Sequence, residues 1–219
     1  MPRVLFKYTK RKYAEALVRD GQIRLGTLLD YQKVERHAPM IGDKDEGVKE
    51  LTEDVDYATE ETLSDFARQL IGMEGASGIT FRNMGFSRHI TSPNCWLFCT
   101  SARLSAKVMR DMDPDYDACV RIDHVALFGR IITTELLRQG LIAGYSSGRL
   151  VECVYRNRSM PYQEDDGLSP VTLKDPSYAE QQEVRFVFHP DTGITVAALD
   201  LTRSALARCC RLVEHIPVE

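Results

Sequence analysis

Near its C-terminal end the chain carries the stretch Gln181-Gln182-Glu183-Val184-Arg185-Phe186-Val187-Phe188. Its apolar and polar side chains alternate, which is the period of a strand with one face on a core. Val184, Phe186 and Phe188 then share the buried face, and Gln181 and Glu183 stand side by side on the polar face. We therefore predict a half-buried strand at 181–188. By itself the polar face needs no ligand, because solvated polar faces are common in antiparallel sheets.

Outside this stretch, the hydrophobic periodicity predicts short strands and a few helices. Strands are predicted at 4–8, 23–28, 79–81, 86–90, 95–100, 117–122, 150–155 and 194–199, the last as the hairpin partner of 181–188. Helices are predicted at 11–20, 59–70, 105–113 and 125–139, with a helical turn at 29–36. An acidic loop is predicted at 43–56 and a long polar loop at 157–175.

The order of these elements predicts the fold class. Helices come early and strands mostly late, without a regular alternation of strand and helix. This order predicts one α+β domain over residues 1–219, with N-terminal helices and a mixed or mostly antiparallel sheet. Residues 40–78 are interpreted as a helical, acidic insertion in that domain.

Composition restricts the class of protein. The chain has 219 residues, of which 43% are hydrophobic and 27% charged, as in an ordinary globular protein. Its net charge of −4 argues against a protein that coats nucleic acid. No apolar run approaches the roughly 20 residues of a membrane helix, and residues 1–7 lack the apolar core of a signal peptide. We therefore expect a cytoplasmic protein with no membrane partner.

Cysteine spacing and motif searches give no familiar catalytic centre. The six cysteines form no C-x-x-C pair and have no histidine at a zinc-like spacing, so we expect reduced thiols and no metal site. The chain contains no G-x-x-x-x-G-K-[ST], no G-x-G-x-x-G and no H-E-x-x-H motif. Candidate chemistry must therefore come from residues that the fold brings together.

Three pieces of the chain occur in an order that suggests such chemistry. The first is the strand at 5–9 with its helix and the Gly-stopped turn at 20–27, and the second is the strand Trp96-Leu97-Phe98-Cys99-Thr100-Ser101. The third is the pair Gln181-x-Glu183. Together they resemble the ADP-ribosyltransferase superfamily. The resemblance implies an ADP-ribosyltransferase-like fold, with NAD as the substrate.

The same resemblance implies roles for particular residues. Glu183 would hold the nicotinamide ribose and stabilise the positive charge that builds when the bond to nicotinamide breaks. Gln181 would face the acceptor. Ser101 would steady the NAD pocket, although Cys99 stands where the superfamily usually begins a Ser-Thr-Ser run. Further NAD-binding candidates are cations for the pyrophosphate and tyrosines that stack on nicotinamide: Lys7, Arg24, Arg185, Tyr8 and Tyr31.

Each of these residues also has an ordinary interpretation. Cations on strands are usually surface charges, and tyrosines on strands and helices are usually core residues. Ser101 is equally typical of a turn or a helix cap. Their grouping in space is therefore the feature that a structure must test.

The whole chain also resembles an uncharacterised bacterial domain family that is often found near phage-defence genes. The shared pieces are a starting L-x-K-Y, a middle C-x-S, a V-Y strand and a late E-V-R, which stand here at 5–8, 99–101, 154–155 and 183–185. That family has no established activity to carry over.

Three functions follow as hypotheses. The leading one is an NAD-dependent ADP-ribosyltransferase, acting as a toxin or phage-defence effector on a protein or nucleic-acid acceptor, with an antitoxin or immunity protein as a candidate partner. The second is a non-catalytic module that binds a partner or senses a ligand, with the acidic segment 43–61 as a contact surface for a basic partner. The third is a metal-dependent nuclease using Asp117, Asp123 and Glu152.

Overall fold

An eight-stranded sheet forms the body of the protein in the computed structural model, which describes residues 3–34, 40–72 and 78–217. All of its strand pairs are antiparallel, and helices pack against it, so the predicted α+β class is confirmed. The strands of this sheet are β1 (Leu5–Thr9), β2 (Gln22–Thr27), β5 (Trp96–Ser101), β6 (Ala118–Ile122), β7 (Gly148–Glu152), β11 (Glu183–Phe188), β12 (Leu199–Thr202) and β13 (Cys210–Leu212).

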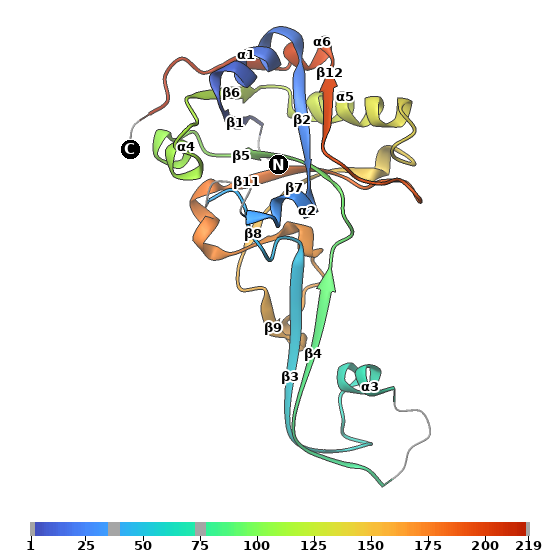
Figure 1. The fold of residues 1–219 in the computed structure, drawn as a ribbon. Helices are drawn as coiled ribbons and strands as arrows, with labels where there is room; N and C mark the ends of the chain where they lie inside the picture. The colour runs from blue at the N-terminus through green and yellow to red at the C-terminus, as the bar shows by residue number, and fades with distance from the viewer. Residues whose placement is uncertain (1–2, 35–39, 73–77, 218–219) are drawn as a thin grey trace.

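Strand β5 organises the sheet (Figure 1). One of its edges pairs with β11 along the whole strand, from Trp96 to Ser101. The other edge is shared, because β2 pairs with Trp96 and Leu97 while β1 pairs at Ser101. β12 continues the sheet beyond β2, and β6 and β13 continue it beyond β1. The sheet therefore splits on this side of β5, beside Phe98 and Cys99.

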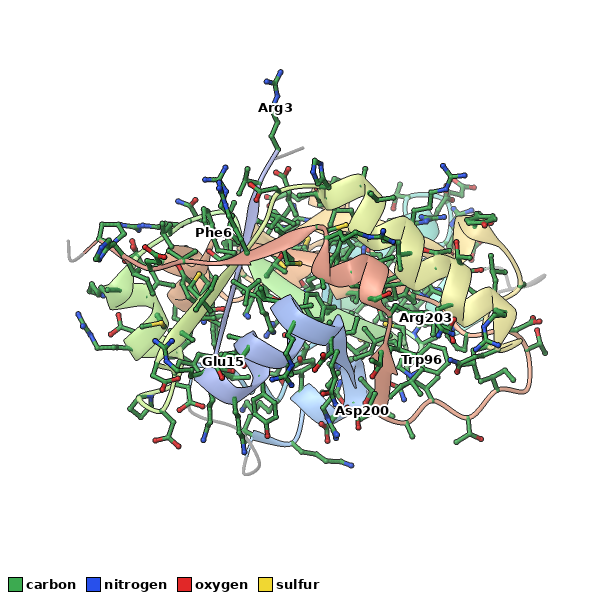
Figure 2. The ribbon with its side chains drawn as sticks, turned by 90° about the horizontal axis from the view of Figure 1, so that it is seen from above. Arg3, Phe6, Glu15, Trp96, Asp200 and Arg203 are labelled. Atoms are coloured by element: carbon green, nitrogen blue, oxygen red, sulfur yellow. The ribbon has the colours of Figure 1, made fainter. Side chains whose placement is uncertain are left out.

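Three helices cover one face of the sheet, as the view from above shows (Figure 2). They are α1 (Arg11–Asp20), α5 (Val125–Arg138) and α6 (Ser204–Ala207), and their apolar side chains form the main core with those of the strands. α1 ends at Gly21, which has a φ of 70°. A Cβ there would lie 1.8 Å from the carbonyl oxygen of Arg203, so only glycine fits. Two short helices lie elsewhere, α2 (Leu28–Tyr31) and α4 (Ala106–Met112).

Both faces of β11 are buried, so the prediction of a half-buried strand is wrong. On the apolar face, the ring of Phe186 lies 5.5 Å from that of Phe128 of α5, measured between centroids. On the other face, Val187 joins a second apolar cluster, and Glu183 and Arg185 form buried ion pairs. Alternation alone cannot separate a solvated polar face from one whose charges are paired inside the fold.

A long hairpin arm leads away from the main sheet (Figure 1). It consists of β3 (Val48–Thr59) and β4 (Thr80–Thr91), with α3 (Asp65–Ile71) between them and β9 (Ser159–Pro161) pairing parallel to β3 near its start. The arm has an apolar cluster of its own, in which Phe66 stacks on Tyr162 at 4.8 Å. The predicted acidic loop at 43–56 and helix at 59–70 are therefore wrong in large part. β3 buries Leu51 and Ala58, exposes Asp54 and Asp56, and pairs with β4, the next strand along the chain.

The remaining segments are short. β8 (Val154–Tyr155) pairs with β10 (Leu173–Lys174), and the segment predicted as a loop at 157–175 contains β9, β10 and two 3-10 turns. Residues 194–199 are not the hairpin partner of β11, because β5 and β7 occupy both of its edges. The 3-10 helices are η2 (Tyr145–Ser147), η3 (Tyr162–Glu164), η4 (Pro170–Thr172) and η5 (Pro176–Gln181).

Two further observations bear on the expectations from composition. All six cysteines are free thiols in the structure. Within residues 3–34, 40–72 and 78–217, no helix has the length and apolar character needed to cross a membrane.

Candidate functional site

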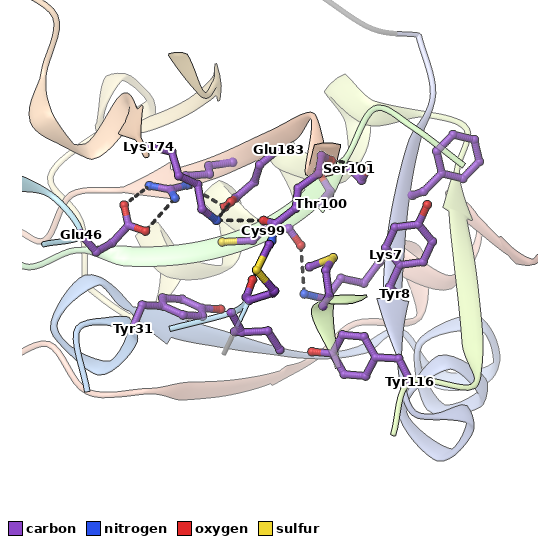
Figure 3. Close-up of a pocket in the computed structure, with 16 residues that line it drawn as sticks. Lys7, Tyr8, Tyr31, Glu46, Cys99, Thr100, Ser101, Tyr116, Lys174 and Glu183 are labelled. Carbon is purple, nitrogen blue, oxygen red and sulfur yellow. Dashed lines mark hydrogen bonds and ion pairs between the residues drawn. The ribbon is translucent and has the colours of Figure 1, made fainter. Parts of the chain in front are cut away.

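Two adjoining cavities lie where β1 and β2 diverge from β5, and Figure 3 draws the side chains that line the inner one. The inner cavity has a volume of about 50 Å³ and the outer one about 690 Å³. Lys7, Tyr31, Ile41 and Tyr116 line both. The outer cavity falls within the range of roughly 300 to 1,000 Å³ that is usual for small-molecule sites. The split in the sheet thus creates a hollow of ligand size beside the middle of β5.

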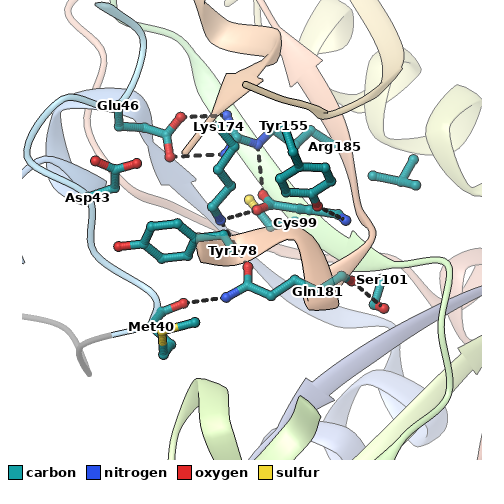
Figure 4. A network of polar contacts seen from close by, with 12 residues as sticks. Met40, Asp43, Glu46, Cys99, Ser101, Tyr155, Lys174, Tyr178, Gln181 and Arg185 are labelled. Atoms are coloured by element: carbon teal, nitrogen blue, oxygen red, sulfur yellow. Dashed lines mark hydrogen bonds and ion pairs between the residues drawn. The ribbon is translucent and has the colours of Figure 1, made fainter. Parts of the chain in front are cut away.

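Glu183 lies in the wall of the inner cavity with both carboxylate oxygens held (Figure 3), and the two cations that hold it, Lys174 and Arg185, are labelled in Figure 4. Arg185 Nε donates to Oε1 at 2.7 Å, and Lys174 Nζ donates to Oε2. Burial on its own would raise the pKa of Glu183, but the two cations reverse this and hold the pKa well below its usual range. Glu183 is therefore a fixed, ionised carboxylate, with lone pairs still available for a ligand hydroxyl.

Arg185 is a fully enclosed cation that connects the site to a distant segment. Only 1% of its surface is exposed. Its guanidinium forms a two-point pair with Glu46, at 2.7 and 3.0 Å, and also donates to Val171 O at 2.7 Å. Glu46 offsets the charge of Arg185, as a buried guanidinium requires. Arg185 was predicted to bind pyrophosphate, but in the structure its donors are used by protein groups.

Gln181 lies beside Glu183, although not on the same strand as predicted. It ends η5, and Gln182, with a φ of 42°, turns the chain into β11. Lys174 Nζ donates to Gln181 Oε1 at 3.0 Å as well as to Glu183. A lysine from β10 therefore holds the Gln and the Glu together, where the sequence predicted that strand pleating would do so.

Lys7 is the cation that faces the split. Its Nζ donates to the carbonyl oxygen of Cys99 at 2.9 Å and lies 5.0 Å from the centre of the Phe98 ring. In the described part of the chain it forms no ion pair with a carboxylate. Burial lowers the pKa of Lys7. An ammonium placed in this way is a suitable partner for an anionic group of a ligand.

Ser101 and Tyr8 line the inner cavity mainly as scaffold. Ser101 Oγ donates to Gln181 O at 2.7 Å, which fixes the end of β5 to the end of η5. Tyr8 is 3% exposed, donates through its hydroxyl to Arg103 O at 2.5 Å and accepts from Ser105 N at 2.8 Å. Its hydroxyl is thus occupied, and burial raises its pKa to about 12.

Tyr31 and Arg24 lie further out. Tyr31 lines both cavities, and its ring lies so close to Gly26 that a Cβ there would meet it at 2.9 Å. Arg24 lines the outer cavity only; its side chain is 65% exposed and lies 3.7 Å from Asp200. The structure therefore gathers seven of the eight predicted residues at the inner cavity and leaves Arg24 on the outer one.

Lys174 and Glu46 are the site residues that sequence reasoning missed. Both fall in segments predicted as polar loops, yet they are 3% and 2% exposed. Tyr155 was also missed; its hydroxyl accepts from Glu183 N at 2.5 Å. No local pattern marks these residues, since their partners are set by how β8, β10 and residues 40–47 pack against β11.

Two other groupings lie away from this site. Asp117 and Asp123 flank β6, whereas Glu152 is the last residue of β7, and β7 lies four positions from β6 in the sheet. The three acids of the nuclease hypothesis are therefore not brought together. Gly144–Gly148 has the spacing G-x-S-x-G, but it forms η2 between a helix and a strand. A nucleophile elbow joins a strand to a helix, so this turn has the wrong context.

Comparisons of the chain with protein-family models, with curated proteins and with solved structures found no match.

Proposed function

We propose that the two cavities bind NAD and that Glu183 promotes cleavage of its nicotinamide–ribose bond, with the ADP-ribosyl group passing to an acceptor. The proposal is carried by one observation: Lys7, Ser101, Gln181 and Glu183, from separate parts of the chain, line one cavity at the split of the sheet. β1 lies next to β5 and β5 next to β11, so the three pieces of the chain on which the resemblance rests are adjacent in the sheet. Consumption of NAD would also suit a toxin or antiviral effector.

The chemistry assigned to Glu183 follows from its fixed charge. As nicotinamide leaves, positive charge builds on the ribose, and an ionised carboxylate that accepts a ribose hydroxyl stabilises that charge. Arg185 and Lys174 keep the carboxylate in place, so it need not reorganise during the reaction. Glu46 offsets the charge of Arg185. It thereby reduces the repulsion between Arg185 and the positive charge that builds on the ribose in the transition state.

The rest of the substrate is assigned to the outer cavity. Its volume of about 690 Å³ suits a dinucleotide, and Lys7 stands where the two cavities meet. We propose that Lys7 contacts the pyrophosphate and that Tyr31 packs against a ring of the substrate. Arg24, at the exposed side of the outer cavity, would contribute weakly.

The test is release of nicotinamide from NAD by the wild type and by Glu183→Gln. We expect the variant to be slower by at least about 100-fold, the usual loss when one preorganised electrostatic contact is removed. Glu61→Gln, an exposed acid on the arm, is the matched control and should behave as wild type. Equal activity of Glu183→Gln and wild type would contradict the assignment. Glu183→Ala is a poorer choice, because it leaves two buried cations without their partner and would destabilise the fold.

A second candidate, a non-catalytic partner-binding module, is favoured by the arm. The arm exposes Tyr57 and Met84, and Asp54 and Asp56 of β3 are exposed as well. We propose this surface for a basic partner, such as an antitoxin or immunity protein. This function alone predicts that NAD leaves the melting temperature unchanged and that Glu183→Gln matches wild type in every NAD assay.

A further inference from the structure

Gln181, the residue that the resemblance assigns to the acceptor, is closed off from solvent. Only 3% of its surface is exposed. Its amide oxygen accepts from Lys174 at 3.0 Å, and its amide nitrogen donates to Met40 O at 2.6 Å. A side chain or a base arriving from outside would have to break both contacts to bind this amide.

The chain around Gln181 is tied down as well. Tyr178 of η5 donates through its hydroxyl to Gly42 O at 3.0 Å, and Ser101 holds the carbonyl of Gln181. Met40 and Ile41, from the same tied segment, line the inner cavity. In the described part of the chain, Gln181 and Glu183 are therefore covered by neighbouring segments that are themselves held by hydrogen bonds.

The space at the carboxylate is small. The inner cavity holds about 50 Å³, against about 690 Å³ in the outer one. A cavity needs roughly 10 to 15 Å³ of such space to hold one water, so the inner cavity has room for a few waters or for one edge of a ribose that enters from the outer cavity. Its polar lining, which includes Glu183 and Ser101, supplies the hydrogen-bond partners that a buried water requires.

We infer that the acceptor is water, so that the protein is an NAD hydrolase and does not modify a protein or nucleic acid. This inference rests on the proposed function. The bond between ribose C1′ and the nicotinamide nitrogen breaks, and its electron pair leaves with neutral nicotinamide. The water oxygen bonds to C1′ and one water proton passes to solvent. The products are ADP-ribose, nicotinamide and a proton, and nothing is oxidised or reduced.

The acceptor is identified by mass balance with labelled NAD and the purified wild-type protein. We expect nicotinamide and ADP-ribose in equal amounts in buffer alone, and an unchanged rate of nicotinamide release when bacterial lysate is added. Release that needs lysate, or label carried by protein, RNA or DNA in amounts that match the nicotinamide, would overturn the inference and leave the proposed function standing. If no nicotinamide is released under any condition, both the inference and the proposed function are refuted.

A second measurement uses the packing around Gln181. Gln181→Ala removes the amide that closes the inner cavity, so methanol added to the buffer should gain access. We expect the ratio of methyl ADP-ribose to ADP-ribose to rise several-fold over wild type, with Gln163→Ala, an exposed glutamine, as the matched control. The same ratio in wild type, Gln181→Ala and Gln163→Ala would contradict a cavity closed by Gln181.

Discussion

Lys174 sets the geometry of the candidate site more than any other residue. Its Nζ contacts Gln181 Oε1 at 3.0 Å and the carboxylate of Glu183, and it lies 4.7 Å from the centre of the Tyr178 ring. Burial alone would lower the pKa of Lys174, but Glu183 reverses this and the pKa is raised. Both members of the pair are thus charged at neutral pH. We assign Lys174 as a positioning residue, since it acts on the substrate only through Glu183 and Gln181.

Replacement of Lys174 should separate catalysis from binding. Lys174→Met should lower kcat for nicotinamide release by about 10- to 100-fold and change KM for NAD by less than about twofold, because the contact of Glu183 matters most in the transition state. It should also raise the pKa of Glu183, so that kcat falls at acidic pH where wild type stays level. Lys174→Arg should restore part of the rate. The measurement is kcat and KM from pH 5 to 8; a Lys174→Met profile that matches wild type would refute the positioning role.

At the scale of the elements, the arm and the main sheet are separate packing units. The arm has its own apolar cluster, which includes Phe66, Phe86 and Met160, whereas β5 and β11 belong to the core under α5. The arm can therefore unfold locally while the main sheet stays folded, because each unit is held by its own buried contacts.

Phe66→Ala tests this independence. It removes the stack on Tyr162 and should cost the arm about 3 kcal/mol. Amide hydrogen exchange should speed up in β4 and α3, while β5 and β11 keep their protection. Tyr57→Ala, which removes a 60% exposed aromatic from the same arm, is the control and should change exchange little. Faster exchange in β5 with Phe66→Ala would mean that the arm and the sheet open as one unit.

The elements that could be predicted from sequence are those with a local signal. α1 follows from its apolar spacing and the stop at Gly21, and β1, β6 and α5 lie within one or two residues of their predicted ranges. The β3–β4 pairing could not be predicted, because β3 is rich in acids and a helix, α3, lies between the two strands. Nor could the burial of β11, which depends on β7 and on residues 40–47.

The candidate site was predictable to a similar extent. Short motifs indicated Lys7, Ser101, Gln181 and Glu183, and these line one cavity. The charges that hold them, Lys174 and Glu46, lie in segments without periodicity. Only the folded chain brings such residues into contact, so a single sequence carries no signal for them.

At the scale of the whole molecule, paired buried carboxylates make stability depend on pH. Hydrogen bonds from Arg138 and then Arg203 hold the pKa of Glu135 below its usual range, and Glu183 is lowered by its own cations. A carboxylate with a lowered folded-state pKa stabilises the fold above its unfolded pKa of about 4.3, and this contribution is lost as pH falls. The free energy of unfolding should therefore decline below about pH 4.5.

Glu135→Gln should reduce that decline. At pH 7 the variant should lose about 1 to 2 kcal/mol, because the charge-assisted hydrogen bonds from Arg138 and Arg203 weaken. Towards pH 3 the difference from wild type should shrink, since Glu135 of the unfolded wild-type chain is then protonated and must lose that proton on folding. Urea unfolding at several pH values measures this, with Glu61→Gln as control. A difference that stays constant with pH would show that the charge of Glu135 is not responsible.

The most direct test of the central claim is a crystal structure of the Glu183→Gln variant soaked with NAD. We predict NAD in the split between β1 and β2, with the nicotinamide ribose within hydrogen-bond distance of residue 183 and a phosphate next to Lys7 Nζ. NAD bound at another surface, or cavities that hold only water at saturating NAD, would contradict it.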